Sequence, residues 1–250
     1  MNTATGTTPP GTSNEQEAAR WVEQMFASIA PRYDFVNHLL SLNIDRWWRK
    51  RLMKRLSPIL KKPDARILDL CCGTGDVLLE MQRQAVLPVL GADFCHPMLI
   101  TAQAKAAQKG LKTPLFEADA LALPIADHVL DAISVAFGFR NLANYETGLR
   151  ELHRVLAPGG MLAILEFSHP PGPIMKTAYG FYSRVLLPVI GSLMSGAPGA
   201  YAYLPESIRK FPRALELRNM MNSAGFVETR FELLTGGIAA LHTGLAARSA

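Results

Sequence analysis

The feature that most constrains the fold is the segment ILDLCCGTGD at residues 67–76. A short apolar run leads into a turn with two glycines, Gly73 and Gly75, and a helical pattern begins at Asp76. A strand, a glycine turn and a helix start in this order are typical of the first unit of an open parallel sheet. In such sheets, ligands bind beyond the carboxyl ends of the strands. The segment therefore predicts an α/β protein with a ligand site at this turn.

Short apolar runs alternate with helical stretches after this turn, and this pattern favours a parallel sheet with crossover helices. We predict strands over residues 66–70, 89–92, 114–117, 132–137, 161–167, 227–234 and 238–245. We predict helices over residues 17–28, 33–42, 44–60, 76–84, 97–109, 145–156 and 214–224. Pro158-Gly159-Gly160 predicts a turn into the fifth strand.

The 250 residues suit one domain with an insertion. Residues 1–16 are rich in Thr, Gly, Pro and Asn and are predicted to be a disordered tail. Residues 17–250 form the predicted domain, with a helical cap at 17–62 and a lid insertion at 170–212. The insertion has no charged residue from 185 to 205, but its prolines and glycines argue against a transmembrane helix.

The first residues contain no apolar signal core, and two of the three cysteines, Cys71 and Cys72, are adjacent. Secretion is therefore disfavoured, and a reducing, cytoplasmic location is expected. The sequence shows no metal-ligand spacing, so no metal site is predicted.

Positive charge is concentrated at residues 45–66, where nine Lys and Arg stand against two Asp, while the whole chain is only +5. Trp47 and Trp48 lie in the same stretch. Tryptophan beside basic residues suits a helix that contacts anionic lipid at the inner face of a membrane. The alternative is a solvated helix whose apolar stripe packs on the domain. Because the patch is short and no binding motif accompanies it, nucleic acid is not a predicted partner.

The glycine turn also indicates the kind of ligand. A dinucleotide site would read G-x-G-x-x-G/A, but this chain has Leu78 at the last position. Asp69 and Asp76 beside the turn oppose a pyrophosphate and favour a cationic ligand. S-adenosylmethionine, which carries a sulfonium and an amino group but no phosphate, therefore fits better than NAD. The alternative is a tight turn with an N-cap aspartate.

Two further acids follow neighbouring strands. Asp93 ends the second predicted strand and can accept both ribose hydroxyls. Asp119 follows the third strand and can accept the adenine amino group, while the Ala120 N–H meets a ring nitrogen. Met98 either covers the adenine face or packs in the core. The candidate cofactor residues derived in this way are Asp69, Gly73, Gly75, Asp93, Asp119 and Ala120.

With these residues in place, the sequence resembles the class I S-adenosylmethionine-dependent methyltransferases. Within that class it resembles the quinone C-methyltransferases of menaquinone and ubiquinone synthesis. The general motif is LDLCCGTGD; the more specific segments are MFASIAPRYDFVNHLLSLNIDRWWRKRL, AFGFRNLANYETGLRELHRVLAPGGMLAILEFSHP, AYAYLPESIRKFP and LTGGIAALHTG. The resemblance covers residues 25–245. It implies an α/β fold with a Rossmann-like, doubly wound, seven-stranded sheet. The sheet is expected to be mostly parallel with an antiparallel last strand, and to carry N-terminal helices and a lid insertion.

The resemblance also implies residue roles. Cofactor contacts are expected at Thr74, Asp93, Asp119 and Ala120. This chain departs from the family at Ala136, where relatives often have Ser, and at Cys72, where many have Gly.

The activity that the resemblance implies is C-methylation of a reduced polyprenylated quinone, converting demethylmenaquinol to menaquinol. The alternative substrate is a ubiquinone-pathway benzoquinol, or the enzyme accepts both. The predicted catalytic residues are Arg140 as a charge stabiliser, Asn141 as a hydrogen-bond donor to the ring oxygen, and Tyr33 as a lid residue and proton relay. His242 is either a base or a structural residue.

Two other readings stay open. An NAD-dependent oxidoreductase is opposed by Leu78, and a non-catalytic membrane-associated binding module is opposed by the intact acids. The expected partners are the polyprenylated quinol, an anionic membrane surface and a second copy of the chain in a homodimer.

Overall fold

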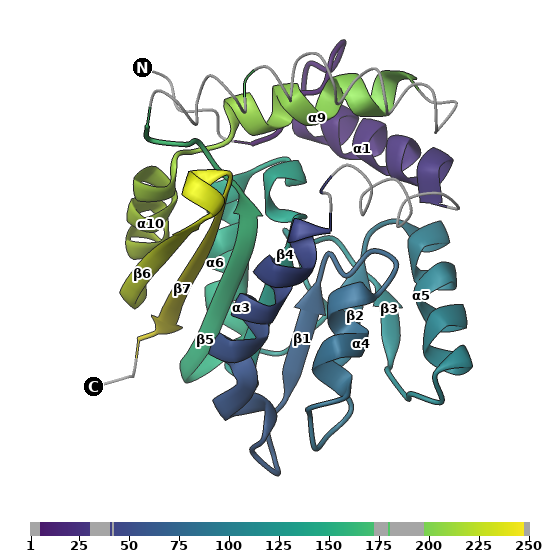
Figure 1. Ribbon diagram of the computed structural model, residues 1–250, viewed down its shortest axis with the longest axis vertical. Coiled ribbons are helices and arrows are strands. Elements are labelled where there is room, and N and C mark those ends of the chain that lie inside the picture. The colour runs from purple at the N-terminus through teal and green to yellow at the C-terminus, as the bar shows by residue number, and fades with distance from the viewer. Residues whose placement is uncertain (1–5, 31–40, 42, 173–179, 181–197, 248–250) are drawn as a thin grey trace.

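The computed structural model describes residues 6–30, 41, 43–172, 180 and 198–247. Its centre is one seven-stranded sheet in the order β3-β2-β1-β4-β5-β7-β6 (Figure 1). The strands are β1 (Ile67–Leu70), β2 (Leu90–Asp93), β3 (Leu115–Glu117), β4 (Leu130–Ala136), β5 (Leu156–Phe167), β6 (Phe226–Leu234) and β7 (Ala239–Ala246). Only β7 runs antiparallel to its neighbours. The predicted fold class and all seven predicted strands are confirmed.

Helices cover both faces of the sheet, as the doubly wound arrangement requires. They are α1 (Glu15–Ile29), α3 (Ile44–Leu60), α4 (Asp76–Gln82), α5 (His96–Gln108), α6 (Tyr145–Val155), α9 (Pro198–Lys210) and α10 (Ala214–Ser223), with 3-10 turns η2 (Phe139–Asn141) and η4 (Thr235–Gly237). One buried core joins the sheet to α6 and α10, and a second joins it to α3 and α4. In Figure 1, α1 and α9 lie across the carboxyl ends of the strands.

Side-chain alternation along β1 explains where its acid points. Leu68 and Leu70 belong to the core that joins the sheet to α6 and α10, whereas Ile67 belongs to the core that joins the sheet to α3 and α4. Successive strand residues face opposite sides of a sheet. Asp69 therefore lies on the same side as Ile67, toward α3 and α4.

β5 begins five residues earlier than predicted, because the expected turn at 158–160 is a bulge within the strand. Leu130 pairs with Leu156, and the next pair is Ala132 with Met161. Four residues of β5 thus stand against one of β4. Glycine is required in this bulge, since a Cβ on Gly160 would lie 2.8 Å from two backbone oxygens.

The N-terminal segment differs from the predicted disordered tail, which is a correction for residues 6–16. The Thr7 N–H donates to the Leu142 carbonyl at 2.8 Å. A Cβ on Gly6 would lie 1.8 Å from the Ala143 oxygen, so glycine allows the close approach. The Asn14 side chain accepts from the Glu17 N–H at 2.9 Å and caps α1. Composition indicated disorder, but these contacts to residues distant in sequence hold the segment in place.

Other differences concern the insertion. α9 begins within the predicted lid, where no helix was predicted and where prolines and glycines argued against a transmembrane helix. Pro198 and Gly199 occupy its first turn, where proline is tolerated. The predicted helix at 33–42, Tyr33 and most of the insertion lie outside the described residues. The division into cap and lid stays a prediction. None of the described helices is long and apolar enough to cross a membrane.

Candidate functional site

A cavity of about 240 Å³ lies at the carboxyl ends of β1 to β4, where the strand order changes direction. This switch point between β1 and β4 is where open α/β sheets bind ligands. The lining comes from α1 and from the segments that follow β1, β2, β3 and β4. The structure therefore places the cavity at the edge that the sequence predicts.

Asp93 fixes the glycine turn to the end of β2. Its Oδ2 accepts from the Gly73 N–H at 2.8 Å, and its Oδ1 accepts from the Cys95 N–H at 2.9 Å. Burial raises the pKa of this carboxyl to about 6. Gly73 has φ +54, and nothing lies within 4 Å of where its Cβ would be. The turn thus presents open backbone to the cavity beside a carboxylate whose remaining lone pairs can accept hydroxyl groups.

The next acid along the edge lines the same cavity. Asp119 Oδ1 accepts from the Leu121 N–H at 2.9 Å. Ala120 and Met98 also line the cavity, although the Met98 side chain is only 2% exposed. The structure thus brings together four predicted cofactor residues, Gly73, Asp93, Asp119 and Ala120.

The other three predicted cofactor residues are not among the described lining residues. The Asp69 side chain is buried and accepts from the Ser134 hydroxyl, and burial raises its pKa to about 7. The Thr74 hydroxyl accepts from Lys105 Nζ at 3.3 Å. Gly75 has φ +85 and packs against Ala102 of α5. These residues support the turn from behind, and their contact with a cofactor stays a prediction.

Asp76 changes the electrostatic argument made from the sequence. Its carboxylate contacts Arg49 Nη1 at 2.6 Å and Lys105 Nζ at 2.5 Å. Burial raises the pKa of Asp76, but the two cations outweigh burial and lower it to about 2. The negative charge of Asp76 is therefore offset by the chain's own cations. The acids that line the cavity are Asp93, Asp119 and Glu15 of α1.

Sharp backbone turns at the ends of β1 and β4 shape the centre of the cavity. Cys71 and Phe137 line it, and both have positive φ, +54 and +59. Gly138 follows Phe137, and a Cβ there would lie 2.3 Å from the Cys71 Cβ. The sequence places residues 136–141, at the end of the fourth predicted strand, near the transferring methyl group, but it assigns no separate role to Phe137.

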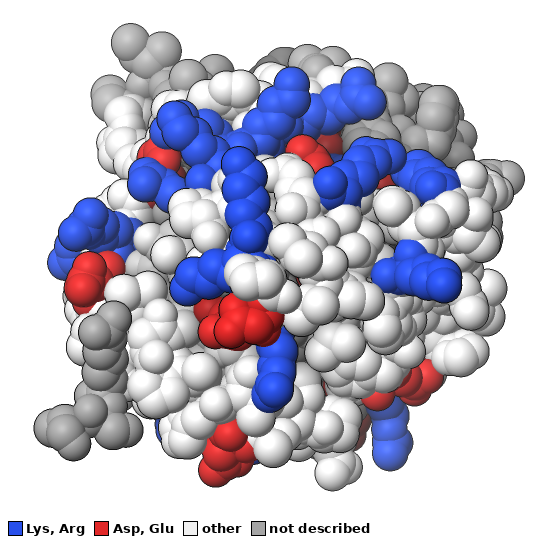
Figure 2. Space-filling model, turned by 90° about the horizontal axis from the view of Figure 1, so that it is seen from below, with Lys and Arg blue, Asp and Glu red and all other residues white. Residues whose placement is uncertain are grey.

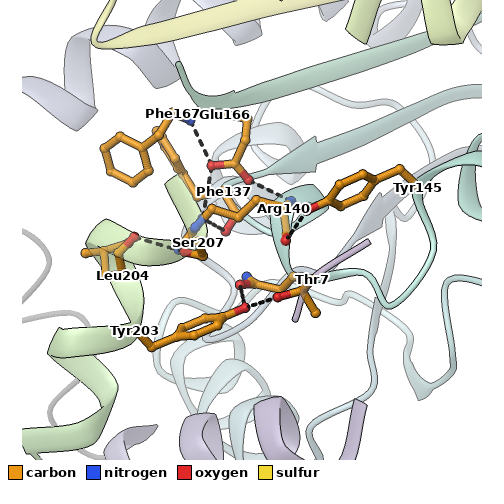
Figure 3. Close-up of polar contacts among 10 residues, drawn as sticks. Thr7, Phe137, Arg140, Tyr145, Glu166, Phe167, Tyr203, Leu204 and Ser207 are labelled. Atoms are coloured by element: carbon orange, nitrogen blue, oxygen red, sulfur yellow. Dashed lines mark hydrogen bonds and ion pairs between the residues drawn. The ribbon is translucent and has the colours of Figure 1, made fainter. Parts of the chain in front are cut away.

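Asn141 lines the cavity, as its predicted catalytic role requires. Its side chain is held at the end of η2, where Oδ1 accepts from the Tyr203 hydroxyl of α9 at 3.1 Å (Figure 3). The amide NH₂ is then the group that remains for a ligand. The sequence offers Tyr203 either as a lining residue of the tail pocket or as a stacked surface aromatic, and the structure places its hydroxyl in contact with the site.

Arg140 belongs to a buried ion pair beside the cavity. Its Nη1 donates to Glu166 Oε1 at 3.0 Å and to the Phe137 carbonyl at 2.5 Å (Figure 3). The guanidinium lies over the Phe167 ring, 5.4 Å from the ring centroid. Arg140 is not among the described lining residues of the cavity. The buried Glu166, which sequence reasoning missed, holds the cation, and a contact of Arg140 with a phenolate stays a prediction.

His242 of β7 is a structural residue. Its Nε2 donates to the Ala214 carbonyl at the start of α10, at 2.9 Å. Burial lowers its pKa to about 4, and the ring lies among buried residues of β7. Within the described ranges, no group of three or more His, Cys, Asp or Glu is placed to hold a metal, and the three cysteines are unpaired.

The sheet order and the switch-point cavity define the class: this is the Rossmann-like fold of the S-adenosylmethionine-dependent methyltransferases. The fold is similar to a crystal structure of an S-adenosylmethionine-dependent methyltransferase from Aquifex aeolicus, with a TM-score of 0.56 at 20% identity over 78% of this chain and 88% of that one. It is also similar to the [4+2]-cyclase SpnF, with a TM-score of 0.69 at 16% identity over 97% of this chain and 100% of that one.

Sequence comparison narrows the class to a family. The chain belongs to the ubiE/COQ5 methyltransferase family, which matches residues 12–246. A demethylmenaquinone methyltransferase of Thermus thermophilus is 51% identical over 88% of this chain and 99% of that protein. A ubiquinone/menaquinone biosynthesis C-methyltransferase of Geobacter sulfurreducens is 41% identical over 91% of this chain and 89% of that protein. The resemblance stated from the sequence is confirmed.

Proposed function

We propose that this protein uses S-adenosylmethionine to methylate a ring carbon of demethylmenaquinol, which gives menaquinol in menaquinone biosynthesis. Family membership and the names of the similar proteins support the reaction class. The observation that carries the proposal is a single cavity that runs from Asp119 and Asp93 past the glycine turn to Asn141. One end offers carboxylates to a nucleoside, and the other offers an amide donor to a phenolic oxygen.

The residues present fit S-adenosylmethionine. Phe94 and Met98 give apolar surface for an adenine, and Asp93 and Asp119 give acceptors for ribose hydroxyls and an amino group. Their negative charge suits a cationic ligand. When bound, S-adenosylmethionine supplies a methyl group on a sulfonium, which an electron-rich ring carbon can accept.

The chain's own residues would orient and stabilise the quinol. A hydroquinone that has lost a phenolic proton carries electron density on its ortho carbon, and the Asn141 NH₂ can donate to the charged oxygen. Arg140 keeps its proton and so is no base. Instead it holds the Phe137 carbonyl, and Phe137 packs against Phe167 and Trp48 with ring centroids 5.0 and 5.8 Å apart. This apolar wall excludes water from the reacting ring. Tyr33 stays a predicted lid residue and proton relay.

A benzoquinol of the ubiquinone pathway is the second candidate substrate. The name of the Geobacter sulfurreducens relative, which covers both quinones, favours it. Both substrates present a phenolate and a polyprenyl tail, so the same residues would serve either one.

The test is methyl transfer by the purified protein. S-adenosylmethionine is supplied with reduced demethylmenaquinone or with a reduced benzoquinone precursor, and products are followed by mass spectrometry. We expect one added methyl group on the naphthoquinol. Transfer to the benzoquinol alone would establish the second candidate, and no transfer to either quinol, with S-adenosylmethionine bound, would contradict both.

A peripheral position on an anionic membrane also belongs to this proposal, since the substrate has a polyprenyl tail. Ile44 and Trp47 in the first turn of α3 are 37% and 48% exposed, beside the exposed Arg46 and Lys50. In Figure 1 this end of α3 is the one that points toward the side of the sheet where α1 and α9 lie. Figure 2 shows Lys and Arg spread over the opposite face as well, so charge alone does not single out a docking side. What supports this side is Trp47, the one aromatic among the exposed large apolar side chains of the described residues, which lies next to Arg46 and Lys50. A cytoplasmic location follows from the same proposal, and the homodimer stays a prediction that light scattering would test.

A further inference from the structure

Three side chains from distant parts of the chain form a hydrogen-bonded row beside the cavity (Figure 3). The Tyr203 hydroxyl of α9 donates to Asn141 Oδ1 at 3.1 Å and lies 2.6 Å from the Thr7 hydroxyl of the N-terminal segment. All three residues are buried, with at most 8% of each exposed. In this protein, therefore, Thr7 brings the described N-terminal segment to the functional site.

The donor and acceptor of each hydrogen bond in the row follow from the single hydroxyl proton of Tyr203. A phenol has one proton to donate, and Tyr203 uses it on Asn141, so its oxygen accepts from the Thr7 hydroxyl. Burial raises the pKa of Tyr203, which keeps the phenol protonated and therefore a donor. Because its oxygen is held in this way, the Asn141 carboxamide cannot exchange the positions of its oxygen and its NH₂ group without losing a buried hydrogen bond.

Both ends of the row are anchored. The Thr7 N–H donates to Leu142, the residue that follows Asn141, and Lys210 Nζ contacts both oxygens of Thr8. The Tyr203 ring packs on Trp21 of α1, with centroids 5.0 Å apart. The segment, α1 and α9 thus hold the two hydroxyls at a fixed place relative to η2. Because Thr7 and Tyr203 are fixed, the Asn141 amide that they hold needs little reorganisation when a substrate reacts.

We propose that Thr7 and Tyr203 are positioning residues that hold the Asn141 carboxamide with its NH₂ group toward the cavity, where it donates to the quinol oxygen. The N-terminal segment is then part of the quinol site. This inference rests on the proposed function, because it assigns a substrate oxygen to the amide.

The experiment compares variants that each lose one hydroxyl and keep the side-chain shape. Tyr203→Phe should lower kcat for demethylmenaquinol about tenfold, and Thr7→Val about threefold. The affinity for S-adenosylmethionine, measured by calorimetry, should not change. Thr12→Val is the matched control, since its hydroxyl bonds only locally to the Pro9 carbonyl and its kcat should match that of the unsubstituted enzyme.

A double-mutant comparison separates positioning from general stability. In an Asn141→Ala background, measured by single-turnover methyl transfer, Tyr203→Phe should cause no further loss, because the group that it positions is gone. An equal loss in both backgrounds, or normal turnover by Tyr203→Phe, would overturn the inference. Absence of methyl transfer by the unsubstituted enzyme would instead overturn the proposed function. The two failures are therefore distinguishable.

Discussion

At the scale of single residues, the buried pair of Arg140 and Glu166 determines the shape of the site. Glu166 accepts from the Arg140 guanidinium at 3.0 Å and from the Arg140 backbone N–H at 3.2 Å. Its side chain is only 1% exposed. A carboxylate buried so deeply depends on the cation for its stability. The pair therefore links β5 to the turn that carries Asn141.

Removing one partner of this pair should be costly. We expect Arg140→Ala to lower the free energy of unfolding by about 3 kcal/mol, because Glu166 is left as an unpaired buried charge. Turnover should fall more than the affinity for S-adenosylmethionine. Urea unfolding measures the first effect, and Arg150→Ala is the control, since its pair with Glu146 is exposed and should contribute less than about 1 kcal/mol. A stable Arg140→Ala protein would contradict this account.

The pKa values of two acids at the turn predict a pH dependence. Burial raises the pKa of Asp93 to about 6 and that of Asp69 to about 7, both above the usual value of about 3.9 for aspartate. Between the unfolded pKa of about 3.9 and the folded pKa values of about 6 and about 7, the folded protein without ligand binds more protons than the unfolded chain. Its stability should therefore fall as pH rises from about 4 to about 7, and stay lowered above that range.

Binding of a cation favours the ionised carboxylates, so the affinity for S-adenosylmethionine should rise over the same pH interval. Calorimetry at pH 5 to 8 and constant ionic strength checks this sign. Asp93→Asn should weaken binding at pH 7.5 and remove the part of the pH dependence near pH 6, leaving the part near pH 7 that belongs to Asp69. An unchanged profile in Asp93→Asn would show that Asp93 is not the titrating group.

At the scale of elements, periodicity predicted well wherever one face of an element is apolar. The observed bounds of α3, Ile44–Leu60, are those predicted, because Trp48, Leu52, Leu56 and Leu60 recur at helical spacing and pack on the sheet. The strands were also predicted, since parallel strands buried on both faces read as apolar runs. α9 was missed because proline and glycine indicate breaks, while the contacts that keep this helix come from α1 and η2, distant in sequence.

The outward face of α3 carries a prediction of its own. The protein should float with vesicles that contain anionic lipid at low salt, and high salt should weaken the association. Trp47→Ser together with Arg46→Glu and Lys50→Glu should abolish flotation. Lys109→Glu with Lys112→Glu makes the same two charge reversals elsewhere on the surface and should retain most of it. Equal losses in both variants would indicate that only net charge matters, and no flotation of the unsubstituted protein would dismiss the surface altogether.

At the scale of the whole molecule, the site joins parts of the chain that no local pattern connects. The positions of Asp93 and Asp119 after neighbouring strands could be predicted, because parallel strands end at one edge of the sheet. The pairing of Asp76 with Arg49 and Lys105 could not, since it depends on how α3 and α5 pack around α4. The same holds for Glu166, which meets Arg140 only when β5 lies beside β4.

The contact between Thr7 and Tyr203 spans 196 residues, and this separation sets the order in which the enzyme matures on the ribosome. At 5 to 20 residues per second, α9 is synthesised about 10 to 40 s after the N-terminal segment. Until then the nascent chain can assemble β1 to β5 and its glycine turn, but it lacks the tyrosine that fixes the amide. A chain that ends before α9 would thus lack the fixed amide, so full turnover would be reached only after residue 203 has been synthesised and has packed against the N-terminal segment.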